Sequence, residues 1–367
     1  MTRNERQGPL HMKAPSESVL SHLRPVASER IHETSNPGSP KFCIVGSGAI
    51  GGTIAGLLLR SGASVSVVAR GDTLAAVKQS GLRLLVENQA LQAPVRVSED
   101  PAELGPQDYV IIAVKAPSLP RLAQRIGPLL GPDTAVVTAM NGVPWWFFLN
   151  AGGKLAGHRL RAVDPMGFIA DAIPIRRVIG CVLFVAASVD EPGVIRHENG
   201  RLLIIGEPDD RLTPRVKCLA EWLRRAGFDS RISQSIRSDI WFKLLGNISM
   251  NPISLLTSAP ADRIMADPLV RRLCITVMEE ASQIAARLDL PMQYSIDQMI
   301  EKLQRLGSFR MSMLQDMERG KPVEIDALLT VTHDIGLLVG VPTPFIDSVL
   351  GLSRLRAEGL GLFERAA

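Results

Sequence analysis

The segment KFCIVGSGAIGGTIAGLLLRSG, residues 41–62, decides the fold of this chain. Its first part, KFCIVG, is a short apolar run that ends in glycine at position 46, and it predicts a buried strand. The rest, residues 49–62, has helical periodicity and ends at Gly62, so a helix follows at once. A strand that passes through a glycine turn into a helix is the opening unit of a parallel α/β sheet.

The turn between this strand and this helix has the pattern G-x-G-x-x-G, in GSGAIG at residues 46–51. Gly46 permits a tight turn, Gly48 leaves room for a pyrophosphate near the backbone, and Gly51 allows close packing of helix on strand. The N–H groups and dipole at the start of the helix favour an anion. We therefore expect a dinucleotide here, and an ordinary glycine-rich turn is the alternative.

The end of the second strand, SVSVVAR at residues 64–70, selects the cofactor. NAD-binding versions of this fold usually carry an acid at this point for the ribose diol. This chain instead has Arg70, whose guanidinium suits a 2′-phosphate. NADP(H) is therefore favoured over NAD(H). Asp72 is the counter-argument, and a solvated arginine at a strand end is the alternative.

Strands and helices continue to alternate after this point. The sequence predicts a helix that becomes extended (74–85), a strand (108–115), a helix (119–130), a strand (134–142), three successive strands (178–189, 193–200 and 201–208), a helix after Pro214 and a short return near 228–233. From about residue 238 onward the periodicity is helical. We expect an α/β Rossmann-type dinucleotide-binding domain over residues 41–234, followed by an all-α C-terminal domain over residues 235–367.

The first 40 residues differ from the rest in composition and periodicity. They are polar, contain five prolines and lack sustained periodicity, so we expect a disordered or loosely attached extension. A single helical turn over Val19–Val26 is the one element that this segment suggests.

Composition narrows the class of protein. Net charge is +4 and aromatic residues make up 4% of the chain, which argues against nucleic acid as the main partner. The longest apolar run, Val178–Ala187, is about half a membrane span, and no secretory signal precedes the first strand. The four cysteines stand far apart and fit no metal-ligand spacing, so no metal site is expected. We expect a cytoplasmic protein without a membrane partner. Its oligomeric state is open, a homodimer included.

Polar side chains recur along one stripe of an otherwise apolar helix. In WFKLLGNISMN, residues 241–251, Lys243, Asn247 and Asn251 are spaced four apart and therefore share one face. A buried lysine tends to lose its charge, and a lysine whose pKa lies near the working pH is an effective general acid. The alternative is an amine that extends to solvent beside two amides.

Two more polar residues stand at strand ends. Lys115 closes the strand 108–115 and Asn141 follows the strand that begins at residue 134. Ligands of open parallel sheets bind outside the carboxyl ends of the strands. Both residues are therefore candidates for contact with cofactor or substrate, and ordinary turn residues are the alternative.

A third motif, SMLQDMERGKPVEID at residues 312–326, has a turn-like centre and an acid, Glu324, at the start of the next helix. Capping that helix is the simplest role of Glu324. Together with the glycine loop, VKA, NG and WFKLLGNISMN, this motif resembles the ketopantoate reductase family (2-dehydropantoate 2-reductase) in the same order along the chain.

The resemblance implies a role for each matching residue. Lys243 would donate the proton to the substrate ketone, and Glu324 would hold a substrate hydroxyl and affect the lysine. Asn247 and Asn251 would hold a substrate hydroxyl and help to position the lysine, and Ser312 would bind the carboxylate of the substrate. NADPH would be held by the residues Gly46, Ser47, Gly48, Ala49, Ile50, Gly51, Arg70, Lys115 and Asn141. The family fold, a Rossmann domain and a helical domain with the active site between them, agrees with the division above.

Two departures from the family pattern concern the substrate. GVPWWFF follows Asn141, and its Trp145 and Trp146 either shape a different pocket or pack the domain. Phe309 stands where well-studied members have an asparagine, and Arg310 beside it suits either a carboxylate or a surface salt bridge. Three hypotheses follow: a reductase that converts ketopantoate to pantoate, a related reductase of another 2-oxo acid, and a non-enzymatic NADP-binding sensor.

Overall fold

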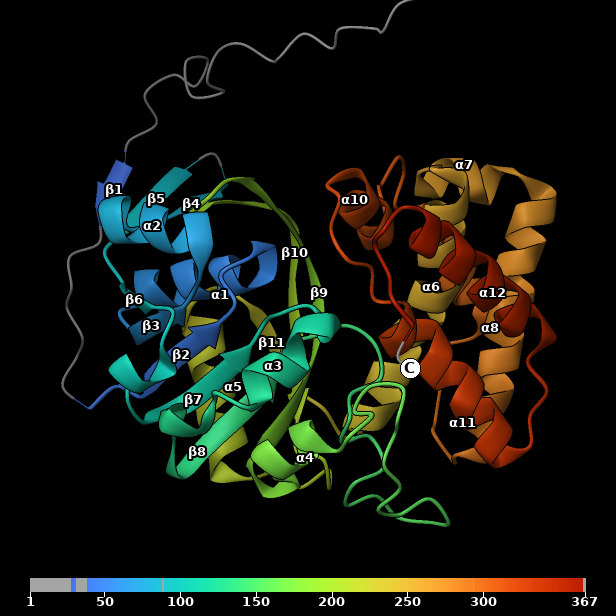
Figure 1. Ribbon diagram of the computed structural model, residues 1–367, viewed down its shortest axis with the longest axis horizontal. Coiled ribbons are helices and arrows are strands. Elements are labelled where there is room, and N and C mark those ends of the chain that lie inside the picture. The colour runs from blue at the N-terminus through green and yellow to red at the C-terminus, as the bar shows by residue number, and fades with distance from the viewer. Residues whose placement is uncertain (1–27, 31–37, 88, 293, 366–367) are drawn as a thin grey trace, which may run out of the picture.

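The computed structural model describes residues 28–30, 38–87, 89–292 and 294–365. An α/β part and a helical part lie side by side (Figure 1). The helical turn expected over Val19–Val26 lies outside the described residues. Of the first 40 residues, Ser28–Arg30 form β1, which pairs in parallel with β5.

The strands of the described residues form one eleven-stranded sheet in the order β1-β5-β4-β10-β9-β8-β7-β2-β3-β6, with β11 beside β10. Strands β2, β3, β6, β7, β8 and β9 pair in parallel, and β10 runs antiparallel to β9. This parallel core confirms the predicted Rossmann-type fold. The bounds are β2 (Lys41–Val45), β3 (Ser64–Val68), β4 (Leu82–Val86), β5 (Gln89–Ala93), β6 (Arg96–Ser98), β7 (Gln107–Ile112), β8 (Leu130–Thr138), β9 (Val178–Glu191), β10 (Val194–Gly206) and β11 (Asp229–Ile232).

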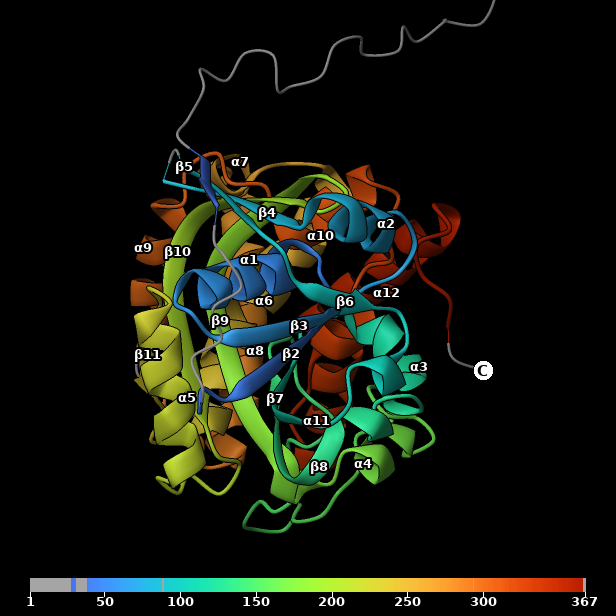
Figure 2. The same ribbon diagram turned by 90° about the vertical axis from the view of Figure 1, so that its left-hand side faces the viewer.

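Both faces of the sheet are covered, as the alternation in β2 shows. Phe42 and Ile44 belong to one buried cluster, with residues of α1 and α5, while Cys43 and Val45 belong to another, with residues of α3 and α4. Successive strand side chains point to opposite faces, so each face has its own core. Figure 2 shows the two helix layers on either side of the strands. The helices of this part are α1 (Ala49–Arg60), α2 (Gly71–Ser80), α3 (Leu119–Ala123), α4 (Phe168–Ala172) and α5 (Pro214–Arg225).

The middle region differs from the expectation of three strands. Residues 193–208 contribute one long strand, β10, whose register against β9 shifts near His197 and Asn199. Gly200 has φ +76°, and a Cβ there would overlap the carbonyl of Phe184. A glycine in the left-handed region is typical of a β-bulge, which takes up the extra residue without ending the strand. The break expected between residues 200 and 201 is therefore wrong, because a bulge lies there within one strand.

The helix expected over 119–130 is shorter than predicted. It ends at Ala123 and is followed by a 3₁₀ turn at Gly127–Leu129. Pro128 cannot donate a backbone hydrogen bond, so the helix cannot continue through it.

The helical part is built around α6. This helix packs against α7, α8, α10 and α12, and it also contacts β9. Among the described residues, no helix is long and apolar enough to cross a bilayer. The bounds are α6 (Ile236–Thr257), α7 (Ala261–Ala266), α8 (Pro268–Arg287), α9 (Ile296–Gln304), α10 (Ser312–Glu318), α11 (Val331–Val339) and α12 (Pro344–Gly359).

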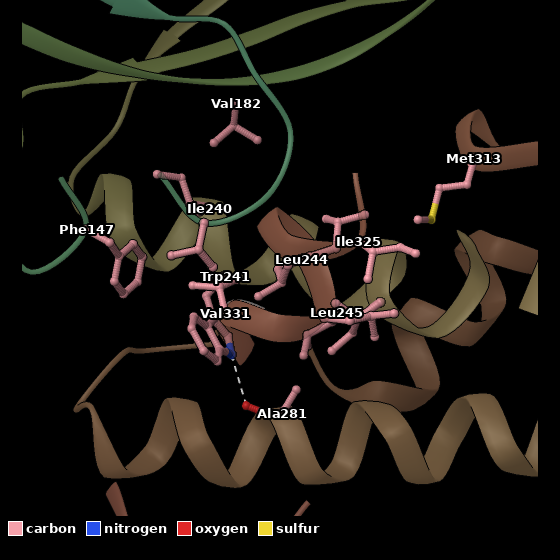
Figure 3. Packing of buried hydrophobic residues seen from close by; sticks show 14 of the residues in the cluster. Phe147, Val182, Ile240, Trp241, Leu244, Leu245, Ala281, Met313, Ile325 and Val331 are labelled. Atoms are coloured by element: carbon pink, nitrogen blue, oxygen red, sulfur yellow. Dashed lines mark hydrogen bonds between the residues drawn. The ribbon is translucent and has the colours of Figure 1, made fainter. Parts of the chain in front are cut away.

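One continuous apolar core joins the two parts. Val182 of β9 and Ile240 of α6 belong to the same buried cluster, and Figure 3 shows them facing each other. The Trp241 indole N–H points the other way and donates to the Ala281 carbonyl of α8 at 2.9 Å. Helix α6 is therefore fixed on one side to the sheet and on the other to the helical bundle.

A π-helical turn makes a second junction. Residues Asp326–Thr330 form this turn, which leads directly into α11. The Ala327 carbonyl within it accepts a hydrogen bond from the Val143 N–H at 2.9 Å, in the loop after β8. Gly142 lies in the left-handed region at φ +84°, and a Cβ on it would overlap the Ala327 carbonyl. The close approach of the two backbones therefore requires glycine at position 142.

Replacing this glycine should destabilise the protein at the junction. Gly142→Ala adds left-handed strain and a backbone overlap, so we expect the free energy of unfolding to fall by about 3 kcal/mol. Gly153→Ala is the matched control, because φ there is +79° and no atom lies within 4 Å of an added Cβ. The control should lose about 1 kcal/mol. Denaturant titration measures both, and equal losses would contradict the junction's role.

Candidate functional site

A cleft of about 1370 Å³ separates the two parts. Its walls are the glycine loop, the ends of β3, β7 and β8, the facing residues of β9 and β10, and the helices α6, α9 and α10. Every site residue predicted from the sequence lines this cleft except Gly51, which is buried behind the loop. The sequence-based candidates thus meet in one place.

The glycine loop has the geometry that an anion cradle needs. Gly46 has φ +95°, and a Cβ on it would lie 2.7 Å from the Val114 side chain. A Cβ on Gly51 would overlap the Gly46 carbonyl, whereas one on Gly48, the N-cap of α1, would meet no atom within 4 Å. The first and last glycines are therefore required by packing. Gly48 faces open cleft, where backbone N–H groups are accessible to a phosphate.

Arg70 lies two residues after the end of β3, at the same cleft. It is exposed, lines the cleft and is the N-cap residue of α2. Asp72 lies in the first turn of that helix, where a carboxylate complements the dipole. The residues present therefore fit a dinucleotide with a 2′-phosphate.

The amine of Lys243 crosses from the helical part to the sheet. Its Nζ donates to Asn141 Oδ1 at 2.8 Å and to the Leu183 carbonyl of β9. Burial lowers the pKa of this amine to about 8, although Cys181 and Glu324 act in the opposite direction. Because burial raises the pKa of the Cys181 thiol to about 12, that thiol is uncharged where the amine titrates. The amine is held by these two acceptors at the wall of the cleft, so it does not extend along the surface to bulk solvent.

A second lysine makes an ion-pair cluster across the cleft. Lys115 Nζ lies 2.6 Å from Asp316 Oδ2 and 3.3 Å from Glu324 Oε2. Glu324 Oε1 also accepts from the Ala116 N–H at 3.0 Å. Burial alone would lower the pKa of Lys115, but the two carboxylates outweigh it and raise that pKa. The Glu324 carboxylate therefore reaches the opposite part of the protein.

The two asparagines of the stripe differ in their surroundings. Asn251 is buried, and its Oδ1 accepts from Ser312 Oγ at 2.9 Å and from the Met313 N–H at 3.1 Å. Its Nδ2 lies 3.4 Å from Asn247 Oδ1, and Asn247 is half-buried on the cleft wall. Asn251 thus holds the first turn of α10 against α6.

The sequence did not identify two groups that accept hydrogen bonds from the lysines of the site, Asp316 and the Leu183 carbonyl. Asp316 follows Ser312 by four residues, a spacing that places both on one helix face and could have revealed it. The Leu183 carbonyl left no such signal, because a backbone acceptor has no sequence signature. Among the described residues, no cluster of three or more His, Cys, Asp or Glu could hold a metal ion.

The departures from the family pattern separate into two kinds. Trp145 and Trp146 are buried and do not line the large cleft; Trp146 packs with its ring 5.8 Å from the Arg237 guanidinium. Arg310 pairs with Glu318 on the surface. Phe309, in contrast, lines the cleft. The tryptophans therefore pack the domain, and Phe309 is the departure that reaches the site.

Comparison with known proteins identifies the family. Residues 42–210 match the family described as ketopantoate reductase PanE/ApbA, and residues 235–357 match its C-terminal domain. The chain belongs to the ketopantoate reductase family. The resemblance found in the sequence motifs is thus confirmed, and the chain is an oxidoreductase acting on CH–OH groups.

Relatives of this ketopantoate reductase family member cover most of its length. A 2-dehydropantoate 2-reductase of Mesorhizobium japonicum is 46% identical over 88% of this chain and 99% of its own. A solved structure of a candidate ketopantoate reductase from Ralstonia solanacearum MolK2 is 50% identical, with TM-score 0.85 and the same coverage of 88% and 99%. The 2-dehydropantoate 2-reductase of Geobacter metallireducens is 28% identical, with TM-score 0.75 over 86% and 99%.

The contrast between the two asparagines can be measured. Asn251→Ala leaves the buried Met313 N–H without its acceptor, so we expect the free energy of unfolding to fall by about 1–3 kcal/mol. Asn247→Ala, on the same stripe but half-buried, should change it by less than about 0.5 kcal/mol. Chemical denaturation of both variants is the measurement. If the two lose the same stability, Asn251 does not anchor α10.

Proposed function

We propose that the protein reduces 2-dehydropantoate (ketopantoate) to pantoate with NADPH, in pantothenate and coenzyme A biosynthesis. The observation that carries this proposal is the Lys243 amine, which lines the interdomain cleft and has a pKa near 8. The names of the relatives support the same substrate. The division near residue 234 is also proposed, with the cofactor on the α/β side and the substrate mainly on the helical side.

The glycine loop and Arg70 support NADPH as the cofactor. The N–H groups around Gly48 would hold the pyrophosphate, and the Arg70 guanidinium would pair with the 2′-phosphate. Ser47, Ala49 and Ile50 line the same wall of the cleft. When bound, NADPH supplies the hydride for the carbonyl carbon.

We propose that Lys243 delivers the proton to the ketone oxygen. Charge develops on that oxygen during reduction, and a positioned ammonium both stabilises and protonates it. Asn141 orients the amine, while Asn247 and Ser312 face the substrate from the helical side. Asn251 would act through Ser312, whose hydroxyl it binds. Glu324 would accept a hydrogen bond from a substrate hydroxyl while Lys115 neutralises its charge.

Two alternatives are distinguished by assay. A reductase of another 2-oxo acid would leave ketopantoate unreduced while another acid of a panel is turned over. A non-enzymatic NADP-binding sensor has no need of a proton donor, so its function would survive Lys243→Ala. The cytoplasmic location, a homodimer and the lack of a nucleic-acid partner stay predictions from the sequence.

The proton donor predicts a pH profile. Because the acid must be protonated, kcat/KM for ketopantoate should be level below pH 8 and fall about tenfold per pH unit above it. Lys243→Ala should lower kcat by about 10²- to 10⁴-fold with NADPH affinity retained. Lys78→Ala, on the outer helix α2, is the control. A Lys243→Ala enzyme with the wild-type rate, or a flat profile to pH 10, would exclude the role.

The cofactor preference rests on Arg70. Arg70→Ala should raise the KM for NADPH roughly tenfold or more, because a charge-assisted contact to phosphate is lost, and leave the KM for NADH nearly constant. Arg121→Ala is the matched control, a cleft arginine on α3 away from the strand end. Steady-state kinetics with both cofactors provides the test. Equal effects on NADPH and NADH would remove the 2′-phosphate argument.

A further inference from the structure

Helix α6 presents two neighbouring stripes to the cleft. Lys243, Asn247 and Asn251 form the polar one, and Phe242 and Gly246 form an apolar one beside it. Each residue of the second stripe precedes one of the first, so the two stripes are offset by about 100° around the helix. The apolar stripe has no part in the chemistry proposed above.

Gly246 is unusual because the fold does not require it. It lies in the interior of a 22-residue helix and is not among the glycines with positive φ. A Cβ added there would come no closer than 3.9 Å to any other side chain, which is ordinary contact. Glycine in a helix interior is less stable than alanine. Neither backbone conformation nor close packing explains it, whereas a bare backbone at the cleft wall leaves space for a ligand.

The space beside Gly246 is bounded by hydrocarbon. The atoms nearest to its added Cβ are Met299 Sδ and Leu303 Cδ2 of α9, both at 3.9 Å. Phe242, one turn earlier on α6, forms the next part of the wall. All three side chains line the cleft yet are at most 8% exposed. A ligand group placed here would exchange water for apolar contacts.

A cation held on aromatic rings lies beside this space and lines the same cleft. Lys302 Nζ lies 5.3 Å from the centre of the Phe242 ring and 3.3 Å from that of Tyr294. The two rings are 5.1 Å apart. The lysine is engaged by the rings, so its charge is directed to aromatic faces and not to the apolar wall around Gly246.

We propose that Gly246, Phe242, Met299 and Leu303 form an apolar subsite that receives the carbon substituent at C3 of the 2-oxo acid. The proposal rests on the reductase function and names the substrate class of the same site. The keto oxygen meets Lys243 on the polar stripe, and the side chain of the acid extends over Gly246. The reaction is unchanged: a hydride adds to C2 and a proton from Lys243 to the oxygen.

The subsite sets the range of acids that the protein reduces. With only hydrogen at position 246, the subsite stays open to the cleft of about 1370 Å³, and we expect it to admit substituents larger than the branched one of ketopantoate. We therefore expect 4-methyl-2-oxopentanoate and phenylpyruvate to be reduced alongside ketopantoate. Pyruvate, whose C3 is a methyl group, should show a lower kcat/KM because it leaves the subsite empty.

Filling the subsite tests the proposal. Gly246→Val places a branched side chain between α6 and α9, and the ratio of kcat/KM for phenylpyruvate to that for ketopantoate should fall at least tenfold. Gly246→Ala should give a smaller fall in the same direction. Gly351→Val is the matched control, because this glycine lies in α12 with no atom within 4 Å of an added Cβ and does not line the cleft. Thermal melts check folding, and calorimetric titration of the 2-hydroxy acids with NADP⁺ gives an affinity that does not depend on turnover.

The outcomes separate the two proposals. A selective loss for phenylpyruvate in Gly246→Val, in both rate and affinity, supports the subsite. Equal losses for both acids, or reduction of ketopantoate alone by the unaltered protein, overturn the subsite and leave the proposed reductase intact. Reduction of the larger acids alone supports the subsite and overturns ketopantoate as substrate. If no 2-oxo acid is reduced, both proposals are wrong.

Discussion

The site depends on one hydrogen-bonded amine that belongs to neither half of the protein alone. Lys243 comes from α6, while its acceptors, the Asn141 side chain and the Leu183 carbonyl, come from the sheet. The same docking that provides these acceptors removes water, and removal of water lowers the pKa of the amine. An amine with this lowered pKa therefore exists only when the helical part and the sheet are packed together. The continuous core through Val182 and Ile240 holds them in that arrangement.

The other contacts across the cleft fix where the two halves meet. An ion pair of this kind contributes little net stability, since removing charges from water offsets most of the attraction. The pairing instead sets the alignment: Lys115 can donate to both carboxylates only when α10 and the segment around Glu324 lie in one arrangement. The π-helical turn adds a backbone contact three residues after Glu324. Its Ala327 carbonyl accepts a hydrogen bond from the loop that carries Asn141. Glu324 and Asn141 are thus positioned by the same junction, one on each side.

The local sequence pattern was enough to predict a residue's position where that position follows from its own helix or strand. The glycine loop, the alternating strands and the stripe on α6 have periodicities that the backbone imposes, and the sheet and helices followed from them. Pairings between distant segments did not follow. The bulge at Gly200 depends on the close approach of the Phe184 carbonyl, and the packing of Trp146 depends on Arg237, which lies far along the chain in α6. Glu324 pairs with Lys115, which lies some 200 residues earlier in the sequence. From the sequence alone, capping of the next helix by Glu324 was an equally good prediction.

The two stripes of α6 let one rigid element set both chemistry and selectivity. Asn251 anchors this helix to α10 and Trp241 anchors it to α8, so it cannot rotate without breaking both contacts. A substrate that meets the polar stripe is therefore presented to the apolar stripe at a fixed angle. The acceptors that tune Lys243 lie on the sheet, so a change at Gly246 alters which side chain fits while the environment of the amine is kept. Under the two proposals, the substrate range of this protein can change through the apolar stripe without loss of the proposed proton donor.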